Sequence, residues 1–167
     1  MSEMSIKLIH QFVTPEGVHE IDQWIEKYPA EEKQSAVMRA LMIVQDQNGS
    51  LTPESMDAVA DYLGMSPIAV YEVASFYSMY QLQPVGRNSI NVCTSISCQL
   101  CDSASVVRHL ENKLEIKLGE TTADGRFTLR AVECLGACVN APMMQVNKNY
   151  HEKLTAEKID AVLEQYS

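Results

Sequence analysis

The sequence lacks several features that would each indicate a class of protein. Nothing in its 167 residues approaches the roughly 18 consecutive apolar residues that a membrane span requires. With 13 basic and 22 acidic residues, and a net charge of −9, it lacks the basic surface with which proteins bind nucleic acids. No Gly-x-Gly-x-x-Gly motif follows a predicted strand, so we predict no nicotinamide site on this chain. We therefore expect neither membrane insertion nor a nucleic-acid partner.

A targeting segment is also missing from the start of the chain. The first 13 residues, MSEMSIKLIHQFV, contain no apolar stretch long enough for a signal peptide, which predicts a cytoplasmic protein. Thiols stay reduced in the cytosol. The five cysteines are an odd number for a disulfide framework, so metal ligands plus one spare thiol explain them better.

The first half of the chain is predicted to be helical. Apolar residues recur at helical spacing in four segments, which cover residues 16–29, 35–49, 52–64 and 66–77. Ser35 is predicted to cap the second helix, and Tyr77 to lie on the inner face of the fourth. Four short amphipathic helices joined by brief turns predict a small helical bundle, to which we assign residues 1–83.

The second half, residues 84–167, is predicted to be a small α/β sandwich. A helix is expected after Cys98, and Thr155 is predicted to cap another helix at the end of the chain. Strands are expected at 89–92, 127–131 and 143–146, where β-branched or alternating apolar residues are bounded by turn signals. The fold class is therefore α+β, a helical bundle followed by an α/β domain.

Four of the cysteines form two closely spaced pairs. Four residues separate Cys93 from Cys98, and three separate Cys134 from Cys138. Each pair follows a predicted strand, in a loop, and two such loops on one sheet can converge at one edge. Four thiolates are the usual ligands of a 2Fe–2S cluster. Gly136 lies inside the second loop, where it lets backbone N–H groups point toward sulfur.

The fifth cysteine provides a competing ligand set. With Cys93 and Cys98, Cys101 completes the C-x₄-C-x₂-C spacing of plant-type ferredoxins, in which Cys134 would be the distant fourth ligand. We favour Cys138 over Cys101 because Cys101 lies at the predicted start of a helix, and because the competing set leaves Cys138 idle. Cys101 is then expected to be a small residue that packs a helix near the cluster.

Other uses of four cysteines fit the spacing less well. A structural zinc site usually has tighter Cys-x₂-Cys pairs. A dithiol redox site would need a Cys-x-x-Cys pair at the start of a helix, and we predict none there. If the four cysteines were only buried structural residues, there would be no reason for them to occur as two pairs, each directly after a strand.

Long stretches of the chain resemble one known family. The stretches are ASFYSMYQLQPVGR, NVCTSISC, DGRFTL and ECLGACVNAPMMQVN, and the resemblance extends over nearly the whole chain. The family is the thioredoxin-like 2Fe–2S subunit of bacterial NADH–quinone oxidoreductase (respiratory complex I). The resemblance implies a thioredoxin-like fold for residues 84–167. It carries the cluster ligands onto four residues, Cys93, Cys98, Cys134 and Cys138.

The resemblance also implies a place in a larger assembly. It implies a one-electron carrier without a complete active site of its own, at the cytoplasmic face of the inner membrane. FMN and NADH are then expected on a partner subunit only, and other peripheral-arm subunits of complex I are expected as further partners. Two alternatives stay open: the same module in an NAD-linked hydrogenase or formate dehydrogenase, and a free-standing thioredoxin-like ferredoxin.

Overall fold

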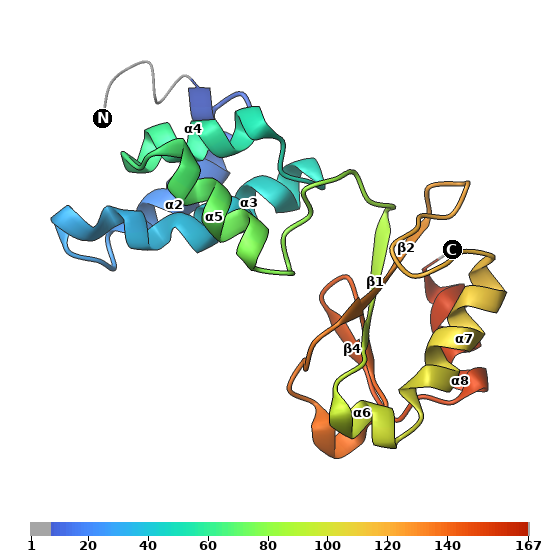
Figure 1. Ribbon diagram of the computed structural model, residues 1–167. Helices are drawn as coiled ribbons and strands as arrows, with labels where there is room; N and C mark the ends of the chain where they lie inside the picture. The colour runs from blue at the N-terminus through green and yellow to red at the C-terminus, as the bar shows by residue number, and fades with distance from the viewer. Residues whose placement is uncertain (1–7, 167) are drawn as a thin grey trace. The chain divides into compact units, whose positions relative to one another are not determined.

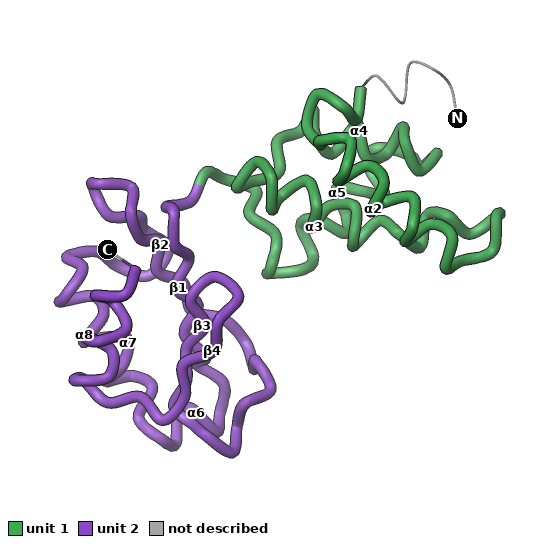
Figure 2. The backbone as a smooth tube through the Cα atoms, turned by 180° about the vertical axis from the view of Figure 1, so that it is seen from behind, with its two compact units in different colours: residues 1–84 green, residues 85–167 purple. Residues whose placement is uncertain are grey.

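Residues 8–166 are described by the structure, a computed structural model, so part of the N-terminal stretch predicted to lack a signal peptide lies outside the described residues. The chain divides into two compact units, Met1–Pro84 and Val85–Ser167 (Figure 2). The division falls one residue from the boundary predicted between residues 83 and 84. Figure 1 shows helices in the first unit, and strands with helices in the second.

The first unit contains the four predicted helices. They are α2 (Pro15–Ile25), α3 (Val37–Asn48), α4 (Pro53–Leu63) and α5 (Pro67–Phe76), and the 3₁₀ segment η1 (Ala30–Ala36) lies before α3. Thr14 and Thr52 cap α2 and α4 through their hydroxyl oxygens, which accept backbone N–H bonds. The predicted cap at Ser35 is wrong, because η1 continues through that residue into α3 without a side-chain cap.

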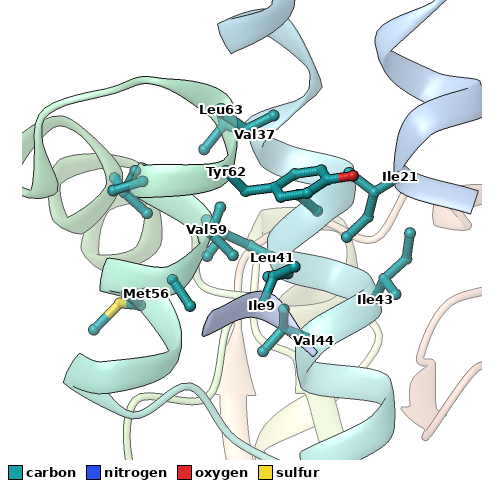
Figure 3. Packing of buried hydrophobic residues seen from close by; sticks show 14 of the residues in the cluster. Ile9, Ile21, Val37, Leu41, Ile43, Val44, Met56, Val59, Tyr62 and Leu63 are labelled. Atoms are coloured by element: carbon teal, nitrogen blue, oxygen red, sulfur yellow. The ribbon is translucent and has the colours of Figure 1, made fainter. Parts of the chain in front are cut away.

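One hydrophobic core holds these helices together. Leu41 and Val44 of α3 and Val59 of α4 are fully buried, as the helical spacing predicts. Tyr62 lies among them with its hydroxyl at the core edge, where it donates to Asp22 Oδ1 at 2.7 Å (Figure 3). Burial, together with that acceptor, raises the pKa of the Tyr62 phenol above its usual range.

Tyr77 departs from the helical prediction. Helix α5 ends at Phe76, and Tyr77 is its extended C-cap residue with its side chain exposed. Tyr80, three residues later, is the buried aromatic residue of this segment, and its hydroxyl donates to the carbonyl of Met38. The predicted inner face therefore extends one residue too far along the chain.

The second unit is a mixed four-stranded sheet in the order β2-β1-β3-β4. The strands are β1 (Asn88–Cys93), β2 (Phe127–Val132), β3 (Met144–Val146) and β4 (Asn149–His151). Strand β1 pairs with β2 in parallel, and the other two pairings are antiparallel. The sequence predicts the first three strands but not β4, whose three residues begin at the end of the predicted turn at 147–149.

Two helices cover one face of this sheet. Helices α7 (Ser103–Leu114) and α8 (Ala156–Gln165) lie side by side against it (Figure 1), while α6 (Ile96–Leu100) and the 3₁₀ turn η2 (Cys138–Asn140) lie at the ends of the strands. Leu110 of α7 and Ile159 of α8 pack on Ile90 and Leu129 of the central strands. The predicted fold class, a helical region followed by a thioredoxin-like α/β domain, is confirmed.

Candidate metal centre

The parallel pair of strands brings the two cysteine segments to one edge of the sheet. Cys93 is the last residue of β1 and pairs in register with Val132, which stands two residues before Cys134. Beyond the strands, the backbone N–H of Thr94 donates to the carbonyl of Val132 at 3.1 Å. Because parallel strands end at the same edge, both segments start from neighbouring points.

A side-chain hydrogen bond joins the two segments directly. The hydroxyl of Ser95 donates to Glu133 Oε2 at 2.9 Å, so a residue between the first two cysteines contacts the residue before the third. Ser95 is also the N-cap residue of α6, which carries Cys98. The prediction that both cysteines of the first pair lie in a loop is therefore wrong for Cys98, which belongs to a short helix.

The first pair of thiols is buried. Cys93 and Cys98 are 2% and 1% exposed, and they form a small apolar cluster with Met143. Burial, together with a hydrogen bond to Cys93, raises the pKa of Cys98 to about 11. A thiol in such surroundings keeps its proton unless a cation stands beside it.

The second pair is exposed and lies in close contact. The sulfurs of Cys134 and Cys138 are 3.4 Å apart, and the N–H of Gly136 donates to Cys134 Sγ at 3.4 Å. That N–H, with the Cys138 thiol, lowers the pKa of Cys134, while the hydrogen bond to Cys134 raises the pKa of Cys138. Of these two thiols, Cys134 is therefore the one that loses its proton more readily.

Interactions between the thiols connect all four of them at one end of the sheet. Cys98 interacts with Cys93 and Cys138, and Cys134 interacts with Cys93. Within residues 8–166, no group of three or more His, Cys, Asp and Glu side chains is arranged to hold a metal ion. The chemistry of the donor set fits a 2Fe–2S cluster, since such a cluster takes four thiolates. Backbone N–H groups at the sulfurs suit the negative charge of such a centre.

Cys101 lies outside this site. It is exposed, and it ends α6 as the C-cap residue, with its N–H bonded to the carbonyl of Cys98 at 3.1 Å. Its side chain lines an open pocket of about 280 Å³. The other lining residues come from α7, among them His109, from the start of α8, and from Pro142 and Leu154. The prediction that Cys101 packs a helix is therefore wrong.

Cys98 and Cys101 also form a Cys-x-x-Cys pair. Cys98 is buried inside α6 and Cys101 stands at the C-terminal end of that helix. A helix N-terminus lowers a thiol pKa, whereas a helix C-terminus does not, so this pair lacks the position that activates a dithiol site.

Sequence reasoning missed the segment that braces the second cysteine loop. Residues 149–154 comprise β4 and the chain after it, and they hydrogen-bond to this loop in several places. The N–H groups of Lys153 and Leu154 donate to the carbonyls of Asn140 and Pro142, at 2.8 and 3.0 Å. The Asn140 side chain donates to Glu152 at 2.7 Å. A turn signal followed by two more residues of strand type could have indicated the hairpin.

Large apolar side chains are exposed around the four thiols. Ile96 and Leu100 of α6 are 73% and 83% exposed, and Val139 is 97% exposed beside Cys138. Such residues on one edge of a folded unit are typical of a surface that a partner covers. We call these three residues the apolar rim.

No helix among residues 8–166 has the length and hydropathy needed to cross a membrane.

Comparison with protein families identifies the family of the chain. Residues 21–167 match the model of the thioredoxin-like [2Fe–2S] ferredoxin family. The chain belongs to this family. The match includes all four thiols and most of the helical unit, and the predicted resemblance is confirmed.

Curated relatives are similar over most of their length. The chain is 46% identical to the E 2 subunit of NADH-quinone oxidoreductase from Rhizobium meliloti, over 88% of this chain and 86% of that protein. It is 47% identical to the E subunit of NADH-quinone oxidoreductase from Rickettsia felis, over 86% of each. The mitochondrial NADH dehydrogenase [ubiquinone] flavoprotein 2 of Dictyostelium discoideum is 42% identical over 91% of this chain and 62% of that protein.

A solved structure shares the fold. A chain of an NAD⁺-reducing [NiFe]-hydrogenase in the H₂-reduced state superposes with a TM-score of 0.65 and 25% identity. The likeness covers 75% of this chain but only 22% of the hydrogenase chain. The module described here therefore resembles about a fifth of that longer chain.

Proposed function

We propose that this chain is a one-electron carrier subunit of an NADH-quinone oxidoreductase, with one 2Fe–2S cluster on the four gathered thiols. The observation that carries the proposal is that β1 and β2 deliver two buried and two exposed cysteines to one edge of the sheet. The ligands are Cys93, Cys98, Cys134 and Cys138. The relatives at 46–47% identity, both named as subunits of such an oxidoreductase, support the function predicted from the sequence.

The chain's own residues hold and shield the centre. When bound, a 2Fe–2S cluster accepts and releases one electron at a time. Cys93, Cys98 and Met143 would shield the buried side of the cluster from water. On the exposed side, the N–H of Gly136 would donate a hydrogen bond to the ligand sulfur of Cys134. FMN and NADH belong on a partner subunit in this proposal, because a flavin is needed to divide a hydride's two electrons.

The assembly would place the chain at the cytoplasmic face of the inner membrane, attached through its partners. The FMN- and NADH-binding subunit is the proposed neighbour of the cluster, and other peripheral-arm subunits complete the assembly. A second candidate is the corresponding subunit of an NAD⁺-reducing hydrogenase, which the shared fold favours. Purification of the native complex separates the two, since only the hydrogenase would bring a nickel-containing subunit.

Spectroscopy of the purified full-length chain tests the proposal. After anaerobic reconstitution with iron and sulfide, we expect two irons and two sulfides per chain and a visible absorption band. Dithionite is expected to produce a paramagnetic signal from one unpaired electron. A colourless protein that binds one zinc per chain and gives no signal after reduction would contradict the proposal.

The apolar rim is expected to contact the flavoprotein subunit. Val139→Asp places a charge on the most exposed residue of the rim, so we expect binding of that subunit to weaken about tenfold or more. The iron content of the chain should stay unchanged, because the Val139 side chain is almost entirely in solvent. Titration calorimetry or surface plasmon resonance measures the affinity.

Leu118→Asp is the matched control for the rim. Leu118 is also exposed, at 40%, but it lies in the loop between α7 and β2, away from the cysteine segments in the chain. We expect this variant to bind with wild-type affinity. Equal weakening by both substitutions would argue against a role of the rim.

A further inference from the structure

One peptide unit in the second cysteine loop makes hydrogen bonds through both its C=O and its N–H. The carbonyl oxygen of Leu135 accepts a hydrogen bond from the Tyr150 hydroxyl at 2.7 Å. The N–H of Gly136, in the same peptide unit, donates to Cys134 Sγ at 3.4 Å. A peptide unit is planar and trans, so its C=O and N–H point in opposite directions. A hydrogen bond that fixes the direction of the Leu135 carbonyl therefore also fixes the direction of the Gly136 N–H.

Gly136 itself does not fix the orientation of this peptide unit. Gly136 adopts a φ of +84°, in the left-handed region, and a Cβ built there would meet nothing within 4 Å. Neither steric contact nor a side chain at Gly136 restrains the rotation of the peptide before it, because glycine allows a wide range of φ. The loop itself is exposed at Cys134 and Cys138. Leu135 and Ala137 pack against the buried thiols, and the Tyr150 hydroxyl adds the hydrogen bond that fixes the direction of the peptide between them.

Tyr150 lies on a β-strand. It belongs to β4 and pairs in register with Gln145 of β3. The chain after it is tied to the same cysteine loop by the N–H groups of Lys153 and Leu154. Tyr150 is 48% exposed, so packing in the core does not account for a tyrosine here. Among residues 8–166, the side chain of Tyr150 makes its hydrogen bond to the carbonyl oxygen of Leu135.

We infer that Tyr150 is a positioning residue of the metal centre, which keeps the Gly136 N–H directed at the sulfur of Cys134. The inference rests on the proposed function, since it assigns a role toward the cluster. A hydrogen bond to a ligand sulfur stabilises the more negative, reduced state more than the oxidised one, so it raises the reduction potential. The bond from Tyr150 also polarises the peptide and strengthens its N–H as a donor.

Tyr150→Phe in the full-length, cluster-loaded chain tests this role. The substitution keeps the ring and removes only the hydroxyl. We expect the midpoint potential, measured by a redox titration followed with electron paramagnetic resonance, to become more negative than in the wild type. Iron retention in competition with a chelator is expected to weaken about tenfold, since losing an outer hydrogen bond at a metal site usually costs at least that much metal affinity. In the metal-free chain, the Gly136 amide hydrogen should exchange faster with solvent.

Tyr166→Phe is the matched control. The Tyr166 hydroxyl also contacts β4, where it accepts a hydrogen bond from the Asn149 side chain at 3.0 Å, but it makes no bond to the cysteine loop among the described contacts. We expect a wild-type potential for this variant. An equal shift in both variants would show a general loosening of β4 and would overturn the inference.

The two proposals fail in different ways. If the wild-type chain binds no iron–sulfur cluster, the proposed function is wrong, and the inference fails with it. If the wild type binds the cluster and Tyr150→Phe keeps the wild-type potential and the wild-type Gly136 exchange rate, only the role of Tyr150 is wrong.

Discussion

The paramagnetic signal of the reduced chain is expected to disappear or change when serine replaces any one of four cysteines, Cys93, Cys98, Cys134 and Cys138. A serine oxygen is a harder donor than sulfur and a poor match for an iron–sulfur centre. Because all four thiols lie in one site, each is needed to complete the ligand set of two irons. Electron paramagnetic resonance and iron analysis of each reconstituted variant measure the effect.

Serine substitutions at the buried and at the exposed cysteines should affect the stability of the metal-free chain differently. Serine at Cys93 or Cys98 leaves a hydroxyl in an apolar cluster, so these variants should also lose stability in the metal-free form, by about 1–3 kcal/mol. Serine at Cys134 or Cys138 lies in solvent and should leave the metal-free fold unchanged. Thermal unfolding of the metal-free variants separates loss of a ligand from loss of the fold.

Cys101→Ser is the control for this series. Cys101 lines the pocket beside His109 rather than the site of the four thiols, and it is exposed. We expect the signal of this variant to be nearly the same as that of the wild type. A signal lost in Cys101→Ser but kept in Cys138→Ser would overturn the ligand assignment in favour of the plant-type spacing.

A second large effect is expected in the core of the α/β unit, at the end of β2 that lies away from the metal centre. Phe127, at the start of β2, is 1% exposed and packs with the fully buried Ile90 and Leu129. Phe127→Ala removes most of this side chain and leaves a cavity, which costs about 3–5 kcal/mol of the free energy of unfolding. For a unit of this size that is a large part of the total stability, so the variant should also bind iron poorly.

Phe76→Ala is the matched control, because Phe76 is 80% exposed at the end of α5. The same chemical change in solvent should alter the free energy of unfolding by less than about 0.5 kcal/mol. Urea denaturation followed by circular dichroism measures both variants. A loss at Phe127 no larger than that at Phe76 would contradict the description of the core.

Local patterns in the sequence predicted most of the fold. Prolines after Thr52 and Ser66, and Gly64, mark helix ends that the structure confirms. The apolar spacing of the core-facing residues also agrees, since Val59 and Leu110 are fully buried. These features depend on residues within one or two turns of each other, which is why they can be read without the tertiary structure.

Two positions in β2 show where local patterns fail. Apolar residues 127, 129 and 131 alternate with polar ones in the sequence, which predicts that Ala131 faces inward and Thr128 outward. In the structure Thr128 is buried and Ala131 is exposed. The Thr128 hydroxyl accepts the N–H of Gly86 at 2.7 Å, and this bond across 42 residues makes its burial possible. Gly86 in turn passes so close to the backbone of Phe127 that a Cβ would stand 2.9 Å from its carbonyl carbon.

The four thiols were named from the sequence, whereas their surroundings were decided by the tertiary structure. Residue type and position after two strands are local facts, and they sufficed to choose Cys93, Cys98, Cys134 and Cys138 as the proposed ligands. Which pair is buried and which is exposed depends on how distant segments pack. The direction of the Gly136 N–H toward sulfur depends on the hydroxyl of Tyr150, which binds the carbonyl of Leu135 across 15 residues of chain. Such hydrogen bonds have no fixed sequence spacing, so only the folded chain could reveal them.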